Sequence, residues 1–141
     1  MILLDTNVVS EPIRQHPDSR VLDWLDAQAI ETLYFSTVSL AELLLGVENL
    51  PIGRRRTALA DALEREIAEL FGDRIMPFDI PAAEACAKLI ARARSQGQAI
   101  SFADGQIAGV AAANKFRVAS RDEQPFRAAG LIVVNPWEHE A

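Results

Sequence analysis

Four acidic residues stand where a folded chain could gather them into one site, and they are Asp5, Glu42, Asp104 and Asp122. Asp5 closes an apolar run at residues 2–4, and Asp122 follows another at residues 118–119. The carboxyl ends of parallel strands share one edge of a sheet, where sites form. Crowded carboxylates raise one another's pKa unless a cation neutralises them, and such hard oxygen ligands suit Mg²⁺ or Mn²⁺. The pattern therefore indicates a divalent-metal site with a metal-bound water as nucleophile.

Three of these acids also have a purely structural explanation. Asp5 begins the turn-rich sequence Asp-Thr-Asn and could cap the turn that follows. Glu42 follows Ser39 by three residues, and Asp104 follows Ser101 by three. This is the spacing of a capping box, in which the acid returns a hydrogen bond to the cap residue. Capping therefore competes with metal binding as a reason for these residues.

Two details weaken the capping explanation. Asp104 falls on the same helical stripe as Ile107 and Ala108, so we expect it to face apolar surroundings. Glu42 is embedded in the run Leu-Ala-Glu-Leu-Leu-Leu at residues 40–45, where an unpaired charge is costly. Asp122, taken alone, resembles an ordinary loop acid.

The histidines, the cysteine and the glycines of the sequence argue against several common kinds of active site. His16 lies in a proline-flanked loop and His139 lies in the tail, which suits neither a catalytic triad nor a histidine base. Cys86 is the one cysteine, which excludes an internal disulfide and a cysteine-rich metal site. The two common glycine-rich motifs that bind phosphates, G-x-x-x-x-G-K-[ST] and G-x-G-x-x-G, are both absent from the sequence. Asn7 replaces the second aspartate of a D-x-D phosphatase, which weakens that alternative.

Short apolar runs alternate with helical patterns along the chain. The runs that predict strands are residues 2–4, 33–35, 75–76, 118–119 and 131–134. The patterns that predict helices are residues 21–25, 39–50, 54–71, 81–96 and 101–114. This alternation indicates an α/β fold with a mainly parallel sheet. The length of 141 residues predicts a single domain that spans residues 1–141.

Composition and charge narrow the class of protein. Hydrophobic residues make up 50% and charged residues 24%, which is typical of a globular protein. The net charge of −6 argues against a nucleic-acid binding partner. Residues 85–130, however, carry seven basic and three acidic side chains. This basic third could contact phosphates or be an ordinary solvated face. With no run long enough for a membrane span and no basic signal-peptide region, we expect a cytoplasmic protein without membrane contact.

Five sequence blocks resemble PIN-domain toxins of the VapC family, in its FitB-like branch. The blocks are MILLDTN at 1–7, S-x-A-E-L-x-x-G at 39–46, DGQIA at 104–108, SRD-x-x-x-F at 120–126 and NPW at 135–137. The resemblance covers essentially the whole chain, with the blocks in order. It implies a PIN-like three-layer α/β/α sandwich with a mainly parallel central sheet. It also implies a Mg²⁺- or Mn²⁺-dependent endoribonuclease, the toxin of a type II toxin–antitoxin system.

The resemblance assigns roles and partners as well. It carries the family's acidic tetrad onto Asp5, Glu42, Asp104 and Asp122, as metal ligands and catalytic residues. Pro125 departs from the pattern, because many VapC sequences have a further aspartate there. The implied partners are an RNA substrate, a cognate antitoxin and a second copy in a homodimer, with DNA contacted only through the antitoxin. The alternative function is a non-catalytic PIN module that binds RNA or a protein.

Four further residues could support the acids, and they are Thr6, Asn7, Ser39 and Arg121. Thr6 and Asn7 could orient Asp5 or a metal-bound water, or only form a turn. Ser39 could cap its helix and orient Glu42, while Arg121 could meet a phosphate or pair with an acid. The cluster of acids also predicts that an antitoxin would insert a basic side chain among them, with arginine the best fit.

Overall fold

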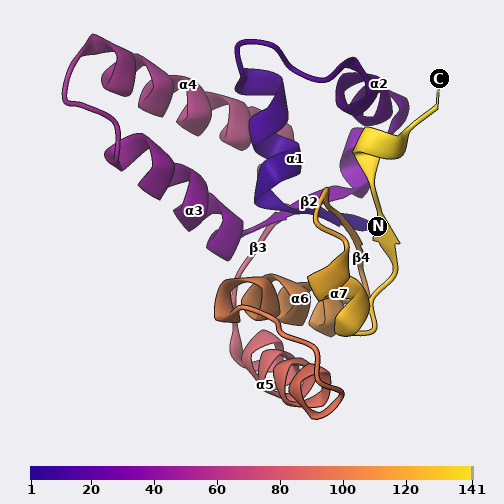
Figure 1. The fold of residues 1–141 in the computed structure, drawn as a ribbon. Helices are drawn as coiled ribbons and strands as arrows, with labels where there is room; N and C mark the ends of the chain where they lie inside the picture. The colour runs from indigo at the N-terminus through magenta and orange to yellow at the C-terminus, as the bar shows by residue number, and fades with distance from the viewer. Residues whose placement is uncertain (141) are drawn as a thin grey trace.

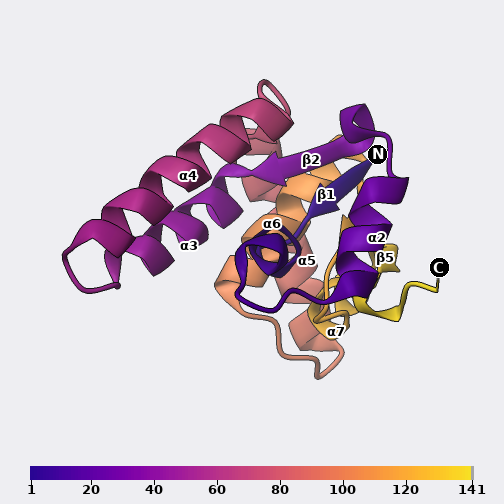
Figure 2. The same ribbon diagram turned by 90° about the horizontal axis from the view of Figure 1, so that it is seen from above.

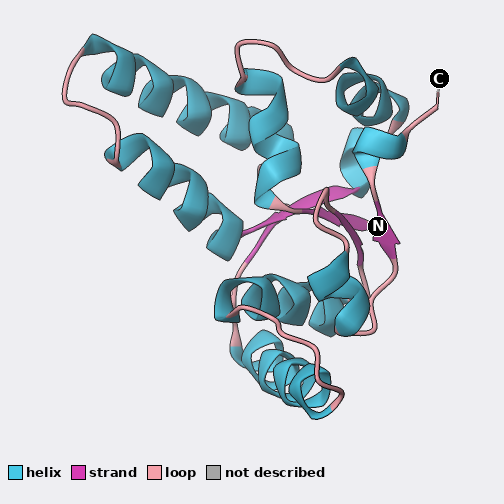
Figure 3. Cartoon of the chain, viewed as in Figure 1, coloured by secondary structure: helices cyan, strands magenta, loops and turns pink. Residues whose placement is uncertain are grey.

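The computed structural model describes residues 1–140 and places a five-stranded parallel sheet at its centre (Figure 1, Figure 3). The strands are β1 (Ile2–Leu4), β2 (Leu33–Ser36), β3 (Ile75–Met76), β4 (Arg117–Ala119) and β5 (Val133–Val134). Their order across the sheet is β3-β2-β1-β4-β5, and every neighbouring pair is parallel. β1 is therefore central, with Leu3 paired to Tyr34 on one side and to Val118 on the other. The predicted α/β fold is confirmed.

Helices cover both faces of the sheet, which makes three layers (Figure 1). On one face lie α1 (Thr6–Ser10), α2 (Ser19–Ala27), α3 (Thr37–Glu48) and α4 (Arg54–Phe71). On the other lie α5 (Ile80–Ser95), α6 (Phe102–Asn114) and α7 (Gln124–Ala128). Short 3-10 helices occupy Glu11–Ile13, Ile30–Thr32 and Pro136–Glu138. Seen from above, α3 and α4 lie side by side and project beyond the sheet (Figure 2).

The alternation of side chains along β1 divides the core into two halves. Leu3 belongs to the cluster beneath α5, α6 and α7, which includes the fully buried Phe126. Ile2 and Leu4 belong to the cluster on the opposite face, which includes the fully buried Phe35. Because β1 is buried on both faces, its residues form a continuous apolar run that ends only at Asp5.

A close approach of α5 and α6 fixes the position of α6 in the fold. A Cβ atom added to Gly109 would lie 2.5 Å from the carbonyl oxygen of Ala82 on α5, and one added to Gly105 would meet Ile90. Larger residues at these two glycines would therefore push α6 away from α5. The tight contact sets the position of the first turn of α6, which carries Asp104.

The start of α3 differs from the sequence-based expectation. The helix begins at Thr37, because the hydroxyl of Ser36 accepts a 3.0 Å hydrogen bond from the backbone N–H of Ser39. Ser39 is thus inside the helix, and the competing capping-box explanation for Ser39 and Glu42 is wrong. The short helices α1 and α7 were not predicted, since five residues show too little periodicity. No helix within residues 1–140 combines the length and apolarity that crossing a membrane requires.

Candidate functional site

The structure brings the four predicted acids together around one hollow, here called the acidic pocket. Its volume is about 330 Å³, and its lining residues are Asp5, Thr6, Asn7, Ser10, Glu42, Asp104 and Asp122. Asp5 follows β1, Glu42 lies on α3, Asp104 lies in the first turn of α6, and Asp122 follows β4. Four separate segments of the chain therefore contribute one carboxylate each.

Asp5 is the buried member of the set, with 7% of its surface exposed. Its carboxylate accepts hydrogen bonds from the backbone N–H of Thr6 at 2.8 Å and from the Ser120 hydroxyl at 2.7 Å. Burial raises the pKa of Asp5 to about 6, although these two hydrogen bonds oppose the increase. The charges of Asp104 and Glu42 raise the pKa further. Asp5 therefore caps α1, as the structural explanation expected, and also faces other acids, while its role as a metal ligand stays a prediction.

Ser120 supports the site but was not predicted as a site residue. It is fully buried directly after β4, and its hydroxyl donates to Asp5. The same oxygen accepts a 3.1 Å hydrogen bond from the backbone N–H of Asp122. A signal was present, because a serine that directly follows a central strand lies beside the residue that ends the neighbouring strand. Ser120 therefore links the two strand-end acids.

Glu42 is solvent-exposed, so the expectation that it stands in apolar surroundings is wrong. It occupies the outer face of α3, where the neighbouring Leu45 is also 60% exposed. Its Oε1 accepts a 2.9 Å hydrogen bond from the Thr6 hydroxyl. Thr6 thus contacts two acids, with its backbone on Asp5 and its side chain on Glu42. Ser39 is fully buried, and its hydroxyl has no hydrogen-bond partner within the described chain.

Asp104 combines a capped helix start with a place in the acidic pocket. Its backbone N–H donates a 3.1 Å hydrogen bond to the hydroxyl of Ser101, so the predicted cap at Ser101 is present. Burial raises the pKa of the half-buried Asp104, the Ser101 hydroxyl lowers it, and the charge of Asp122 raises it again. Asp122 itself is exposed in the loop after β4.

Asn7 and Arg121 meet at the edge of the acidic pocket. Asn7 lines the pocket, and its Oδ1 accepts a long hydrogen bond of 3.5 Å from the backbone N–H of Arg121. The Arg121 side chain forms no ion pair with an acid among residues 1–140. Instead its guanidinium carbon lies 5.4 Å from the ring centre of Trp137.

The donor set of the acidic pocket suits a divalent cation. Side-chain oxygens of four carboxylates and of hydroxyl groups line it, and hard cations prefer such ligands. Within residues 1–140, no group of three His, Cys, Asp or Glu side chains is close enough to form a ready-made ion cage. In protein sites Mg²⁺ keeps several of its waters and binds one or two carboxylates directly. Burial first, and the charges of Asp104 and Glu42 after it, raise the pKa of Asp5, and a cation bound beside these acids would favour its ionised form.

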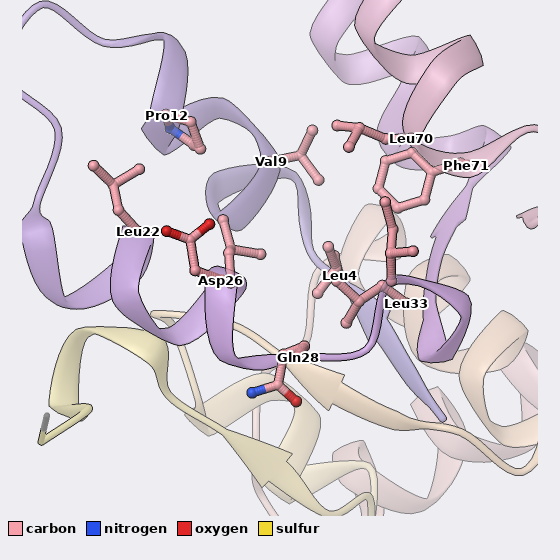
Figure 4. A pocket seen from close by; sticks show the side chains of 11 residues that line it. Leu4, Val9, Pro12, Leu22, Asp26, Gln28, Leu33, Leu70 and Phe71 are labelled. Atoms are coloured by element: carbon pink, nitrogen blue, oxygen red, sulfur yellow. The ribbon is translucent and has the colours of Figure 1, made fainter.

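A second hollow of about 480 Å³ differs in chemistry (Figure 4). It lies among β1, α1, α2, the start of β2 and the end of α4, with Leu4, Leu33 and Phe71 in its wall. Asp26 is the only charged residue of its lining. An apolar hollow with one carboxylate offers no set of ligands or acid–base pair, so the acidic pocket is the stronger candidate for the functional site.

The PIN domain family matches residues 2–131. The plasmid stability protein StbB from Pseudomonas syringae pv. tomato is 51% identical over 138 residues, covering 98% of this chain and 99% of the relative. A VapC ribonuclease from Sinorhizobium fredii is 49% identical over 138 residues, with the same coverage of 98% and 99%. Toxin FitB from Neisseria gonorrhoeae is 46% identical over 137 residues, covering 97% and 99%.

Solved structures share the fold over the whole chain. The crystal structure of FitAcB from Neisseria gonorrhoeae matches with a TM-score of 0.94 at 46% identity, covering 98% of this chain and 99% of that one. The structure of FitAB bound to a DNA fragment matches with a TM-score of 0.94 at 44% identity, covering 100% and 99%. VapBC2 from Rickettsia felis, bound to a promoter DNA fragment, gives 0.79 at 26% identity, covering 96% and 98%.

Proposed function

The chain belongs to the PIN domain family, and from this premise we propose that it is a toxin of a toxin–antitoxin system that cleaves RNA with the help of a divalent cation. The observation that carries the proposal is the acidic pocket, where four segments of the chain bring Asp5, Glu42, Asp104 and Asp122 together. Relatives named as a VapC ribonuclease and as toxin FitB, at 49% and 46% identity, support the same conclusion.

The four carboxylates would hold Mg²⁺ or Mn²⁺, and the bound cation would activate a water and stabilise charge on the phosphate. The chain's own contribution is to hold the acids in place. Ser120 and the Thr6 backbone orient the Asp5 carboxylate, and the Thr6 hydroxyl orients Glu42. Asp104 is fixed by the first turn of α6, which Ser101 caps. Such hydrogen bonds to ligand carboxylates set their direction and basicity.

The partner in this proposal is an antitoxin that covers the acidic pocket. Solved relatives include the FitAB and VapBC2 complexes bound to DNA, which supports a partner that also carries the DNA contact. An antitoxin arginine could pair bidentately with a carboxylate of the pocket and take the place of the cation. Further contacts would fall beside α3 and α4, where Leu45 on α3, Leu70 on α4 and Ile52 in the loop between them are exposed.

A homodimer is part of the same proposal, because exposed apolar side chains need a cover. Leu45 on α3 is 60% exposed and Phe102 at the start of α6 is 63% exposed. A groove between these helices is lined by Thr37, Val38, Ala41, Glu42, Leu45, Ala103 and Gln106. Sedimentation of the purified chain should give the mass of two copies, and a monomer at micromolar concentration would contradict this part.

The experiment that tests the catalytic function is RNA cleavage by the purified chain. We expect cleavage in Mg²⁺ or Mn²⁺, none after EDTA, and recovery when the cation is restored. Asp104→Asn should abolish cleavage, whereas Asp61→Asn, at an exposed acid on α4, should leave it unchanged. A wild-type chain that binds RNA without cutting it in either cation would favour the non-catalytic module instead.

A further inference from the structure

A stacked pair of side chains lies beside the acidic pocket. Arg121 directly follows Ser120 and precedes Asp122, a residue of the pocket lining. Its guanidinium carbon is 5.4 Å from the ring centre of Trp137, within the range of a cation–π contact. Asn7, also in the pocket lining, accepts the backbone N–H of Arg121. The arginine is therefore anchored at both its backbone and its side chain next to the acids.

The positive charge of Arg121 is not neutralised by an ion pair within residues 1–140. Among residues 1–140, no carboxylate lies within ion-pair distance of its guanidinium, and the residue is exposed. Asp18 is close enough to interact with Arg121 electrostatically, but Arg20 already holds both of its oxygens, at 3.0 and 2.7 Å. The Arg20 contact is the main reason that the pKa of Asp18 falls to about 2. Arg121 thus keeps hydrogen-bonding capacity for a ligand.

Trp137 is a rigid platform for this arginine. It is 5% exposed, and its backbone N–H donates a 3.0 Å hydrogen bond to the Oδ1 of Asn135. The Asn135 amide donates in turn to Glu123 at 3.2 Å, and Glu123 also accepts from Arg127 at 2.7 Å. A tryptophan held in this way limits the directions that the guanidinium can take.

RNA binding at the acidic pocket requires a positively charged side chain such as Arg121 in addition to the metal ion. An RNA backbone that approaches four carboxylates is repelled, and a single bound divalent ion compensates only locally. We propose that Arg121, oriented by Trp137, binds an RNA phosphate next to the one that lies at the acids. The inference rests on the proposed function and adds a substrate-positioning residue to it. A planar guanidinium on an aromatic face is weakly hydrated and presents a fixed fork to phosphate oxygens.

RNA binding measured at different salt concentrations tests this role, because each lost phosphate contact reduces the salt dependence. For single strands the slope of log affinity against log salt changes by about 0.7 per contact. Fluorescence anisotropy of a labelled single-stranded RNA would be followed in EDTA, between about 50 and 200 mM salt. The chains compared are wild type, Arg121→Gln, Arg121→Lys and the control Arg65→Gln, at an exposed position of α4.

We expect Arg121→Gln to make the negative slope shallower by about 0.7 and to weaken binding about tenfold at low salt. Arg121→Lys should keep the wild-type slope, because it keeps the charge, and bind more weakly than wild type because it lacks the planar fork. Arg65→Gln should match wild type. A double-mutant cycle isolates the positioning role, since Trp137→Leu should weaken binding in wild type but not in Arg121→Gln.

The outcomes separate this inference from the proposed function. If wild type cleaves RNA in Mg²⁺ while Arg121→Gln binds with an unchanged slope, Arg121 is not a phosphate contact and the function stands. If Arg121→Gln weakens only antitoxin binding, the arginine serves that partner and the inference is overturned. A wild-type chain that neither binds nor cleaves RNA would overturn both.

Discussion

The hydroxyl of Ser120 donates a 2.7 Å hydrogen bond to Asp5, which lies 115 positions earlier in the chain. The contact exists because β1 and β4 are neighbours in the parallel sheet, so that the residues after both strands meet at one edge. It stabilises the charged form of an acid whose burial favours the neutral form. The ionisation of Asp5 therefore depends on a balance between burial, this hydrogen bond and the neighbouring acids.

Replacing Asp5 by asparagine should stabilise the metal-free protein at neutral pH. The pKa of Asp5 rises from 3.8 to about 6 on folding, so the folded state keeps a proton that the unfolded chain loses between these values. The free energy of unfolding therefore falls as the pH rises through this window, by at most about 3 kcal/mol. Asp5→Asn removes the penalty, and urea denaturation in EDTA should find it more stable than wild type at about pH 7 but not at about pH 4. A variant that is less stable at neutral pH would support a mainly structural role for Asp5.

Replacing Ser120 by alanine should move the acidic limb of the pH–rate profile to higher pH. Without the hydroxyl, Asp5 loses one of the two hydrogen bonds that lower its pKa. The carboxylate then needs a higher pH to ionise, and part of the lost rate should return as the pH is raised. Ser95→Ala, at an exposed serine whose hydroxyl bonds the Arg92 carbonyl, is the control. A uniformly lower rate with an unshifted profile would contradict the prediction.

The Thr6 hydroxyl should matter for metal affinity rather than for folding. Thr6→Val keeps the shape of the side chain but removes the donor that contacts Glu42. We expect the half-saturating Mn²⁺ concentration for cleavage to rise about tenfold, since partners of metal ligands have effects of this size. Thr6→Ser keeps the hydroxyl and should resemble wild type, so equal Mn²⁺ requirements in both variants would refute the role.

Antitoxin and cation should compete for the acidic pocket. An inserted arginine would occupy the place of the cation, so each ligand should weaken the affinity of the other by the same factor. Calorimetric titration of Mn²⁺ into the free chain and into the complex with antitoxin measures this coupling. Mn²⁺ affinity unchanged by saturating antitoxin would rule out insertion of an arginine. The antitoxin would then block the toxin without entering the acidic pocket.

The longer helices and the central strand were predictable because they rest on strong local sequence signals. The apolar run of β1 ends at a charge, and the helix predicted at residues 54–71 has these same bounds in the structure. The start of α3 was missed, because Ser36 and Ser39 are both good cap residues and only the fold decides between them. Likewise α1 and α7 depend on tertiary packing of five residues each.

The candidate site was predictable in its acids but not in their surroundings. The placement of Asp5 and Asp122 after strands predicts one sheet edge, and the structure places both in one pocket. The exposure of Glu42 could not be read from its leucine-rich neighbours, because α3 projects beyond the sheet and leaves its outer face uncovered. The contact between Arg121 and Trp137 joins a loop to the end of the chain, and no local pattern predicts it.

A Mn²⁺ titration of the free chain tests the central claim most directly, namely that Asp5, Glu42, Asp104 and Asp122 together bind a divalent cation. The electron paramagnetic resonance signal of free Mn²⁺ would be measured at neutral pH for wild type, for Asp→Asn or Glu→Gln variants at each of the four positions, and for Asp61→Asn. We expect wild type and Asp61→Asn to bind Mn²⁺ equally and every pocket variant to bind it more weakly. Binding that is unaffected by all four substitutions, or no binding by wild type, would contradict the account.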